Sequence, residues 1–354
     1  MPVTPPPGLS IYKKSKAQKG FTLFCPIRHE RAYLVDMNGK VAKRWNIGQG
    51  GINHAMLLPN GNLFVCQWAD GGAPLKAGKA GLLREYDWKG RVVWEHVDVN
   101  QHHDARRLPN GNTIYLAWEA MTKKDAKRVK GGRPGSECED GHIYADVIRE
   151  VNPAGEVVWE WRTSELKIED YPIVEMYSRE EFAHANTIFP MKNGDILVSF
   201  RILNTIMVID KKTRKVKWEM RDDGWGGQHD CKVLPNRNIL LFANGFYSPG
   251  HHSYSRVLEF NPRTRKVKWE YKAPRALDFW SSHISGAQRL ENGNTFICEG
   301  AYGRLFEVTP EGETVWEYSN PYHTDNPEVG KMNWTFRAYR YTASSPEIQR
   351  RLSQ

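Results

Sequence analysis

The sequence of 354 residues predicts an all-β protein, a single six-bladed β-propeller of four-stranded antiparallel blades. Two repeated patterns predict this fold: a Trp-bearing strand that follows a turn, and a hairpin built around an Asn-Gly turn. Apart from the part of the chain that contains the long segments 120–143 and 164–182, both recur at intervals of roughly 45–55 residues, which is about the length of one propeller blade. The chain shows no long helix-periodic segment that would interrupt the series.

The Trp-bearing pattern occurs six times, each time after a short apolar segment such as LLREYD or IMVID. Its copies are DMNGKVAKRW, DWKGRVVWE, NPAGEVVWE, DKKTRKVKWE, NPRTRKVKWE and TPEGETVWE, with tryptophans at Trp45, Trp94, Trp159, Trp218, Trp269 and Trp316. Each copy is interpreted as strands C and D of one blade.

A second hairpin precedes five of these copies. Its turns are LPNGN (58–62), LPNGN (108–112), MKNGD (191–195), LPNRN (234–238) and LENGN (290–294). Asn-Gly is a strong hairpin signal because both central turn positions require positive φ. This hairpin supplies strands A and B, with strand A innermost beside the central channel.

The first repeat lacks its own strand A, because GFTLFCP (20–26) matches a strand B. The segment NWTFRAYRY (333–341) supplies the missing strand, so the two ends of the chain close the ring and remove the free sheet edges. The single domain then covers 1–354. We expect an N-terminal extension at 1–19 and blades at about 20–48 with 333–342, 50–98, 99–163, 180–222, 225–273 and 279–320.

The formal net charge of +9 favours small anionic partners. Lys and Arg are spread along the chain, so nucleic acid is not an expected partner. Five widely spaced cysteines without a C-x-x-C pair indicate small buried side chains. The sequence shows neither a membrane-spanning run nor a signal peptide. We therefore expect no membrane association and a cytoplasmic protein, or a periplasmic one if a leader has been removed.

The long irregular segments all fall between strands B and C or between blades. They are 68–81, 120–143, 164–182, 245–255 and 319–332, and the fourth includes His251 and His252, which we expect to be exposed. This topology places them on one face of the ring, opposite the short Asn-Gly turns. Such a face is where a substrate site is expected.

Four histidines mark the start of strand A in their blades: His103, His184, His229 and His283. Each lies an odd number of residues, seven or nine, before the turn Asn of its hairpin, and equal parity places them on one face. His54 has the opposite parity and needs a β-bulge to join them. A single such histidine is typical of a structural hydrogen bond to a neighbouring blade. Four of them that meet at one channel mouth favour a functional site.

Polar residues end strand B at the same mouth: Gln67, Glu119, Arg201, Asn244 and Glu299. The Arg201 guanidinium suits a tetrahedral oxyanion, because its donors match sulfate or phosphate oxygens. A salt bridge from Arg201 to Glu119 or Glu299 is the structural alternative. Asp104 and Asp230 follow His103 and His229 directly, and we interpret them as acceptors for backbone amides of the next blade.

The segments AHANTIFPMKNGDILVSFR (183–201), GQHD…LPNRNILLF (227–242) and FRAYRY (336–341) resemble the bacterial arylsulfotransferases that work without the nucleotide sulfate donor PAPS. The resemblance covers most of the chain from about residue 20. It implies a six-bladed propeller that transfers a sulfuryl group between phenols through a sulfohistidine, without a cofactor. The partner is then a small anionic aromatic substrate.

The same resemblance assigns roles. His229 is the nucleophile, His184 and Arg201 hold the sulfuryl oxygens, and His103 stabilises charge or transfers a proton. We expect further substrate contacts from His283, His54, Glu119, Asn244 and Glu299. We expect a short form without the N-terminal β-domain of the known transferases, and His283 and His54 go beyond the histidine set that the resemblance implies.

Two other functions stay open on the sequence. One is a metal-dependent hydrolase, lyase or oxidoreductase in which His103, His184, His229 and His283 bind copper, iron or zinc. The other is a non-catalytic propeller that binds an anion or a protein partner.

Overall fold

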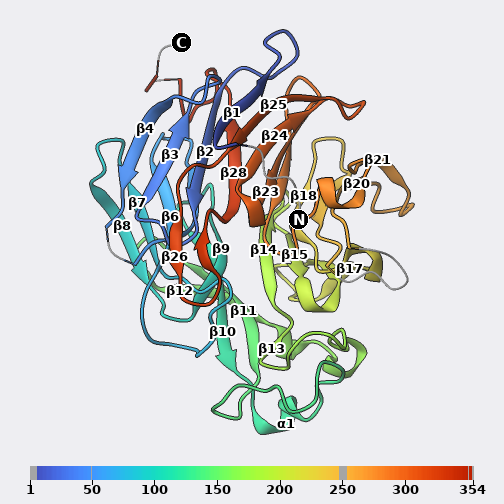
Figure 1. The fold of residues 1–354 in the computed structure, drawn as a ribbon. Helices are drawn as coiled ribbons and strands as arrows, with labels where there is room; N and C mark the ends of the chain where they lie inside the picture. The colour runs from blue at the N-terminus through green and yellow to red at the C-terminus, as the bar shows by residue number, and fades with distance from the viewer. Residues whose placement is uncertain (1–5, 49, 247–252, 350, 353–354) are drawn as a thin grey trace.

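The computed structural model describes residues 6–48, 50–246, 253–349 and 351–352, so His251 and His252 lie outside the described residues. Over these residues the chain forms the expected six-bladed β-propeller of mostly antiparallel strands (Figure 1). In hydrogen-bonded order, each blade begins with its innermost strand.

The first three blades are as follows. The first has β28 (Thr335–Tyr341), β2 (Phe21–Pro26), β3 (Arg31–Val35) and β4 (Val41–Asn46). The second has β5 (Ile52–Leu57), β6 (Leu63–Trp68), β7 (Gly81–Tyr86) and β8 (Val92–Val97). The third has β9 (Gln101–Arg107), β10 (Thr113–Ala120), β11 (Tyr144–Val151) and β12 (Val157–Arg162), and the short β13 (Glu181–Phe182) pairs in parallel with β11.

The last three blades repeat this order. The fourth has β14 (Ala185–Pro190), β15 (Ile196–Phe200), β16 (Thr205–Ile209) and β17 (Val216–Arg221). The fifth has β18 (His229–Val233), β19 (Ile239–Ala243), β20 (Arg256–Phe260) and β21 (Val267–Tyr271). The sixth has β22 (Gly286–Arg289), β23 (Thr295–Glu299), β24 (Arg304–Val308) and β25 (Thr314–Ser319).

Few elements lie outside the blades. The hairpin of β26 (Thr324–Asn326) and β27 (Gly330–Met332) precedes the last strand, and α1 (Lys123–Ala126) is a single short helix. Six 3-10 turns cover Thr163–Glu165, Ile168–Asp170, Arg201–Leu203, Asp223–Trp225, Ala276–Asp278 and Gly300–Tyr302 of the described chain. None of the described helices has the length and apolar character to cross a membrane.

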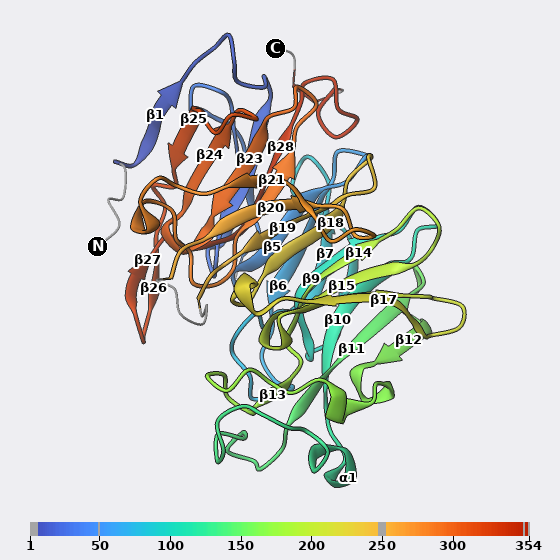
Figure 2. The same cartoon turned by 90° about the vertical axis from the view of Figure 1, so that its right-hand side faces the viewer.

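The two ends of the chain close the ring, as the sequence predicts. β28 pairs with β2, with Phe21 opposite Tyr341, and the red and blue strands lie side by side in Figure 1. The segment expected as an extension also contains a strand, β1 (Gly8–Tyr12), which pairs with β25 at the outer edge of the sixth blade (Figure 2). The inner strands contact one another around the whole ring, from β5 through β9, β14, β18 and β22 to β28.

The six repeated tryptophans form an outer belt around the ring. Each indole N–H donates to a backbone carbonyl in the turn between the third and fourth strands of the next blade, at 2.7–3.3 Å. The last contact, from Trp316 to Met37 at 2.9 Å, joins the sixth blade to the first. The pattern that identified the blades in the sequence therefore also joins them to one another.

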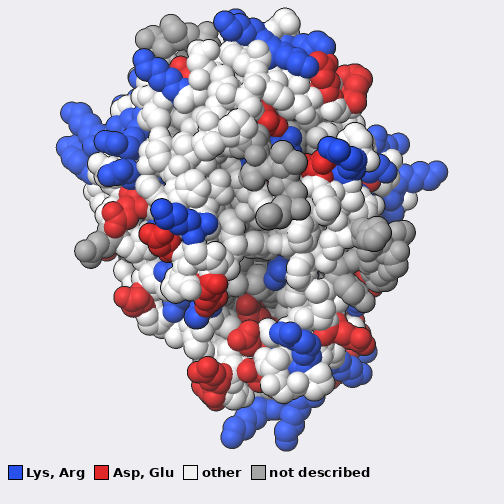
Figure 3. Space-filling model, viewed as in Figure 1, with Lys and Arg blue, Asp and Glu red and all other residues white. Residues whose placement is uncertain are grey.

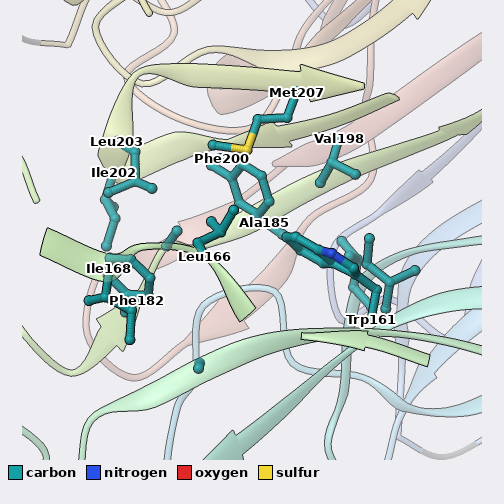
Figure 4. Close-up of a cluster of buried hydrophobic side chains, with 14 of the residues drawn as sticks. Trp161, Leu166, Ile168, Phe182, Ala185, Val198, Phe200, Ile202, Leu203 and Met207 are labelled. Carbon is teal, nitrogen blue, oxygen red and sulfur yellow. The ribbon is translucent and has the colours of Figure 1, made fainter. Parts of the chain in front are cut away.

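The apolar core lies largely between neighbouring blades. Figure 4 shows the largest cluster, in which Trp161 of the third blade packs with Ala185, Val198 and Phe200 of the fourth. Branched and aromatic side chains favour strands and fill the space between two sheet faces. All five cysteines are free and buried, as expected. On the surface in Figure 3, acidic and basic side chains are interleaved.

The short turns differ in one respect from the expectation of two positive φ values. In the described turn 58–62 only Gly61 has positive φ, at 81°, and Asn60 Oδ1 accepts from the amide of Asn62 at 2.9 Å. In LPNRN the equivalent position is Arg237, with φ of 66°. A side chain at positive φ is strained, since Gly is the residue that tolerates it.

Candidate active site

A cavity of about 460 Å³ opens at the channel mouth on the face that holds the long loops. Its lining includes all four histidines of the predicted cluster, His103, His184, His229 and His283, together with Arg201. The loop 68–81 and the β26–β27 hairpin complete the wall through Lys76–Lys79 and Asn326–Glu328. A cavity of this size accommodates a small organic ligand.

β-Bulges, rather than regular strand parity, place these side chains. In β9, His102 pairs with Leu116 and Ala105 with Tyr115, so His103 and Asp104 are both extra residues. In β18, His229 pairs with Phe242 and the next pair is Lys232 with Leu240. The argument from odd offsets is therefore wrong, because the inner strands do not alternate regularly across this region.

Two of the four histidines precede their strands. β14 begins at Ala185 and β22 at Gly286, so His184 and His283 belong to the segments that enter the fourth and sixth blades. His184 has φ of 59° and His103 has φ of 49°. These unusual backbone positions occur in the cavity wall, where strain is commonly found at functional sites.

Each of the four rings uses Nδ1 for a contact with the protein. The partners are His102 Nδ1 for His103 (2.8 Å), Glu181 Oε1 for His184 (2.9 Å), Asn244 Oδ1 for His229 (2.8 Å) and Ser282 Oγ for His283 (2.9 Å). Among the described hydrogen bonds, none uses Nε2 of these rings. The Nε2 atoms are therefore the nitrogens available to a ligand.

The tautomer of His229 follows from its neighbours. Asn244 Nδ2 donates to the carbonyls of Ser281 (2.8 Å) and Ile284 (3.0 Å), which fixes Oδ1 as the end of the amide that faces His229. Nδ1 also lies 3.0 Å from the carbonyl oxygen of Gly227. Both partners only accept, so Nδ1 holds the proton and Nε2 has a free lone pair.

His184 is supported by a buried carboxylate. Glu181 Oε1 contacts its Nδ1, and Glu181 Oε2 accepts from the indole of Trp118 at 3.1 Å. Burial acts to raise the pKa of Glu181, but His184, His102 and Trp118 together outweigh it and hold that pKa below its usual range. The carboxylate contacts His184 Nδ1 and so fixes the orientation of the ring.

His103 contacts two other histidines. Its ring centroid lies 4.6 Å from that of His184 in an edge-to-face arrangement, and its Nδ1 contacts His102 Nδ1. His102 stacks on Trp118 at 4.2 Å, and its Nε2 lies 3.3 Å from Asp146 Oδ1. A chain of contacts therefore connects the cavity to a buried carboxylate.

Burial and neighbouring positive charge keep most of the cluster neutral. The pKa values of His103 and His229 are held well below the usual range by burial first. The charges of His184 for His103 and of Arg201 for His229 act in the same direction. Burial lowers the pKa of His283 to about 4. Neutral imidazoles with a free lone pair are nucleophiles and bases.

Arg201 lines the cavity and forms no ion pair with a described residue. Its guanidinium lies over the ring of Tyr177, 4.9 Å from the centroid, and its Nε is buried without a hydrogen-bond partner among the described residues. The expected alternative, a salt bridge to Glu119 or Glu299, is wrong. Glu119 pairs with Arg162 at 3.0 Å and Glu299 with Arg304 at 3.0 Å.

Four residues expected to contact substrate do not line the cavity: His54, Glu119, Asn244 and Glu299. Asn244 lies behind His229, as described above. The bulge that His54 required does occur, between Ile52 and His54, but it brings Asn53 to the cavity. The His54 ring is buried with Nε2 2.7 Å from the hydroxyl of Tyr339, and burial lowers its pKa to about 3.

Asp104 and Asp230 accept backbone amides of the following blade, as the sequence predicts. Asp104 Oδ2 accepts from Ile188 at 3.1 Å, and Asp230 Oδ2 accepts from Ala287 at 2.9 Å. Arg337 of β28 lies between them, 2.8 Å from Asp104 and 3.3 Å from Asp230. These charges join the inner strands below the cavity.

Glu181 and His102 were not among the predicted site residues. Glu181 is three residues before His184 and His102 adjoins His103, so their closeness in sequence to a predicted histidine was the available signal. The lining residues Arg28, Trp68 and Lys79 were not predicted either. Within the described parts of the chain, no three His, Cys, Asp or Glu side chains form a group that would hold a metal ion.

The fold and the site together define a six-bladed propeller with a histidine-lined channel mouth. The chain belongs to the arylsulfotransferase (ASST) family, whose sequence model matches residues 54–321. No curated protein is similar enough to the chain to count as a match.

Solved structures share the fold. A protein of unknown function from Bacteroides caccae is 14% identical with a TM-score of 0.57, over 91% of this chain and 98% of that one. A streptogramin B lyase is 11% identical with a TM-score of 0.50, over 96% of this chain and 95% of that one. At these identities the likeness extends to the fold alone.

Proposed function

We propose that this chain transfers a sulfuryl group from a phenolic sulfate ester to a second phenol, with His229 as the intermediate carrier. The observation that carries the proposal is the fixed tautomer of His229, whose Nδ1 faces two acceptors. A neutral imidazole with its lone pair on Nε2, held beside Arg201 in a cavity, suits attack on an electrophilic sulfur. Membership of the arylsulfotransferase family supports an aryl sulfate as the donor.

The reaction has two balanced steps. First, His229 Nε2 attacks sulfur, the bond from sulfur to the phenolic oxygen breaks, and the phenolate takes a proton. Second, an acceptor phenol loses its proton, its oxygen attacks sulfur, and the bond from sulfur to Nε2 breaks. His103, whose buried ring is neutral, is the proposed base that accepts the proton of the second phenol, and the departing phenolate takes its proton from solvent. Arg201 and the His184 ring supported by Glu181 stabilise negative charge on the other sulfuryl oxygens.

Donor turnover tests the proposal. With 4-nitrophenyl sulfate and phenol, we expect release of 4-nitrophenol, and His229→Ala should lower that rate by about a thousandfold or more. Donor alone should leave one sulfuryl group on the His229 peptide, visible by mass spectrometry. His142→Ala, at an exposed histidine outside the cavity, is the matched control and should keep wild-type rates.

Three results would contradict the proposal. They are no turnover by the wild type across varied phenols, full activity of His229→Ala, and loss of activity on removal of a stoichiometric metal. The last would favour the metal-dependent alternative, for which elemental analysis is the direct measurement.

The pH profile gives a separate test. Attack requires neutral His229, and burial together with Arg201 holds its pKa well below the usual 6.5. The acid limb of kcat/KM should therefore lie below pH 6.5. A limb above that value would show that the nucleophile is another group.

A further inference from the structure

The cavity has two halves that come from opposite sides of the ring. The histidines and Arg201 come from the third to sixth blades and the segments that enter them. The other half, here called the cationic half, is formed by Arg28, Trp68, Lys76 and Lys79. Arg28 follows β2 of the first blade, and the other three lie at the end of β6 and in the loop beyond it. In a ring of six blades the first and fourth are opposite, so Arg28 and Arg201 approach the cavity from opposite sides.

Arg28 presents an unpaired guanidinium. It lies over the indole of Trp68, 3.2 Å from the ring centroid. The side chain is exposed, and among the described residues the guanidinium forms no ion pair or side-chain hydrogen bond, although the nearby Asp70 carboxylate acts on its charge. A guanidinium that stacks on an aromatic ring keeps its N–H edge free and fixed in direction, which suits a carboxylate or sulfate.

Two neighbouring lysines add to the positive charge of this half of the cavity. Lys79 is buried, and its Nζ lies 5.4 Å from the Trp68 ring and donates to the carbonyls of Gly71 and Ala73. Its positive charge therefore has no carboxylate in direct contact. Lys76 is exposed and pairs with Glu328 at 2.7 Å. The cavity lining thus holds four Lys and Arg residues and one Glu, Glu328.

Aromatic side chains line the space between the two halves. The Trp334 ring lies 4.6 Å from that of His283, and the Phe336 ring lies 5.9 Å from that of His103. Both residues line the cavity. A phenyl ring held against them would have one end at the histidines and the other toward Arg28.

We propose that the aromatic substrate has a second anionic group, a carboxylate or a second sulfate, which binds the Arg28 guanidinium in the cationic half. This inference rests on the proposed function for the end of the substrate that faces the histidines. The subsite gives the Arg28 guanidinium an anionic partner, and it makes the preferred substrate a dianion.

Binding of stable ligands tests the subsite without any reaction. 4-Sulfobenzoate has a sulfonate and a carboxylate on opposite ends of one ring, and benzenesulfonate lacks the carboxylate. By calorimetry we expect the wild type to bind 4-sulfobenzoate about 10-fold more tightly. Arg28→Gln should remove that preference, whereas Arg31→Gln, an exposed arginine nearby outside the cavity, should keep it.

Turnover gives a second readout. The ratio of kcat/KM for 4-carboxyphenyl sulfate to that for 4-nitrophenyl sulfate should fall about 10-fold in Arg28→Gln and stay constant in Arg31→Gln. Comparing ratios between variants cancels the different reactivity of the two leaving groups.

The two proposals can fail separately. If no donor reacts but the binding preference depends on Arg28, the subsite stands and sulfuryl transfer does not. If donors react but Arg28→Gln changes neither the binding preference nor the turnover ratio, the subsite is overturned.

Discussion

The outer belt and the inner mouth of this propeller connect the same six blades in different ways. In the belt, one contact is repeated six times, an indole N–H donated to a carbonyl of the next blade. At the mouth, five of the six inner strands, β28, β5, β9, β14 and β18, have a shifted register. Repetition of one contact holds the ring together, and local departures from the repeat provide the site.

The energetics of the two regions also differ. The belt uses neutral hydrogen bonds, each of which contributes about 1 kcal/mol and acts largely alone. The mouth rests on buried charges that depend on one another, with Arg337 between Asp104 and Asp230. Each carboxylate has a second cation, Arg106 for Asp104 and Lys232 for Asp230, so removing one member leaves the buried charge only partly compensated. We expect larger and less additive effects there than in the belt.

The largest loss of stability is expected from Arg337→Met. It removes the cation shared by two buried carboxylates, which then keep only Arg106 and Lys232, and should lower the free energy of unfolding by about 3 kcal/mol. Denaturant unfolding measures this, and adding Asp104→Asn should restore part of the loss. A cost under about 1 kcal/mol would mean that the inner charges are no more critical than the belt.

Glu181→Gln tests the support of His184. The variant removes the negative charge behind the ring and should lower kcat/KM about 10- to 100-fold. It should also weaken inhibition by inorganic sulfate, which a purely structural role would leave unchanged. Glu180→Gln, at the exposed neighbouring position, is the control. Equal sulfate inhibition in both variants would show that Glu181 does not act through His184.

A smaller loss is expected from Trp316→Phe in the outer belt. The indole is fully buried and its N–H bonds to Met37 across the junction between the last and first blades. The change should lower stability by about 1–2 kcal/mol and leave kcat/KM at the wild-type value. Trp269→Phe, at an equivalent but less buried position, should cost less. Equal losses of stability in the two variants would mean that the tryptophan contact at the closing junction contributes no more than the others.

The smallest effect, and the one gain, is expected from Arg237→Gly. Gly accepts the positive φ of this turn position, and the change should raise stability by about 0.5–1 kcal/mol. Arg237→Ala shortens the side chain and keeps the strained backbone, so it should give no such gain. If Ala stabilises as much as Gly, the backbone conformation is not the cause.

The fold was predictable because its determinants are local and repeated. The tryptophan turns identify six units, and the missing inner strand of the first unit points to the C-terminal segment that supplies it. The N-terminal strand β1 was missed, because GLSIY pairs with an edge that only the folded sixth blade provides. Pairing across more than 300 residues leaves no local pattern.

The site was predictable in its main members and not in its geometry. Histidines at blade entrances are visible in a sequence, and four of them meet with Arg201 in one cavity. Bulges cannot be counted from residue numbers: the one that His54 required does occur, yet Asn53 and not His54 lines the cavity. Glu119 and Glu299 have arginine partners on other strands of their own blades. Arg28 becomes a candidate only when its distance from Trp68 is known.

Because the four histidines come from four blades, the site can form only when the ring is assembled. No pair of adjacent blades contains all four histidines. Of the aromatic wall, Phe336 belongs to the ring-closing strand β28 and Trp334 directly precedes it. A half-ring would hold well-formed sheets and an unassembled site. Ring closure pairs the most distant parts of the chain, a type of step that is slow in folding. Recovery of turnover during refolding should therefore lag behind recovery of the β-sheet signal.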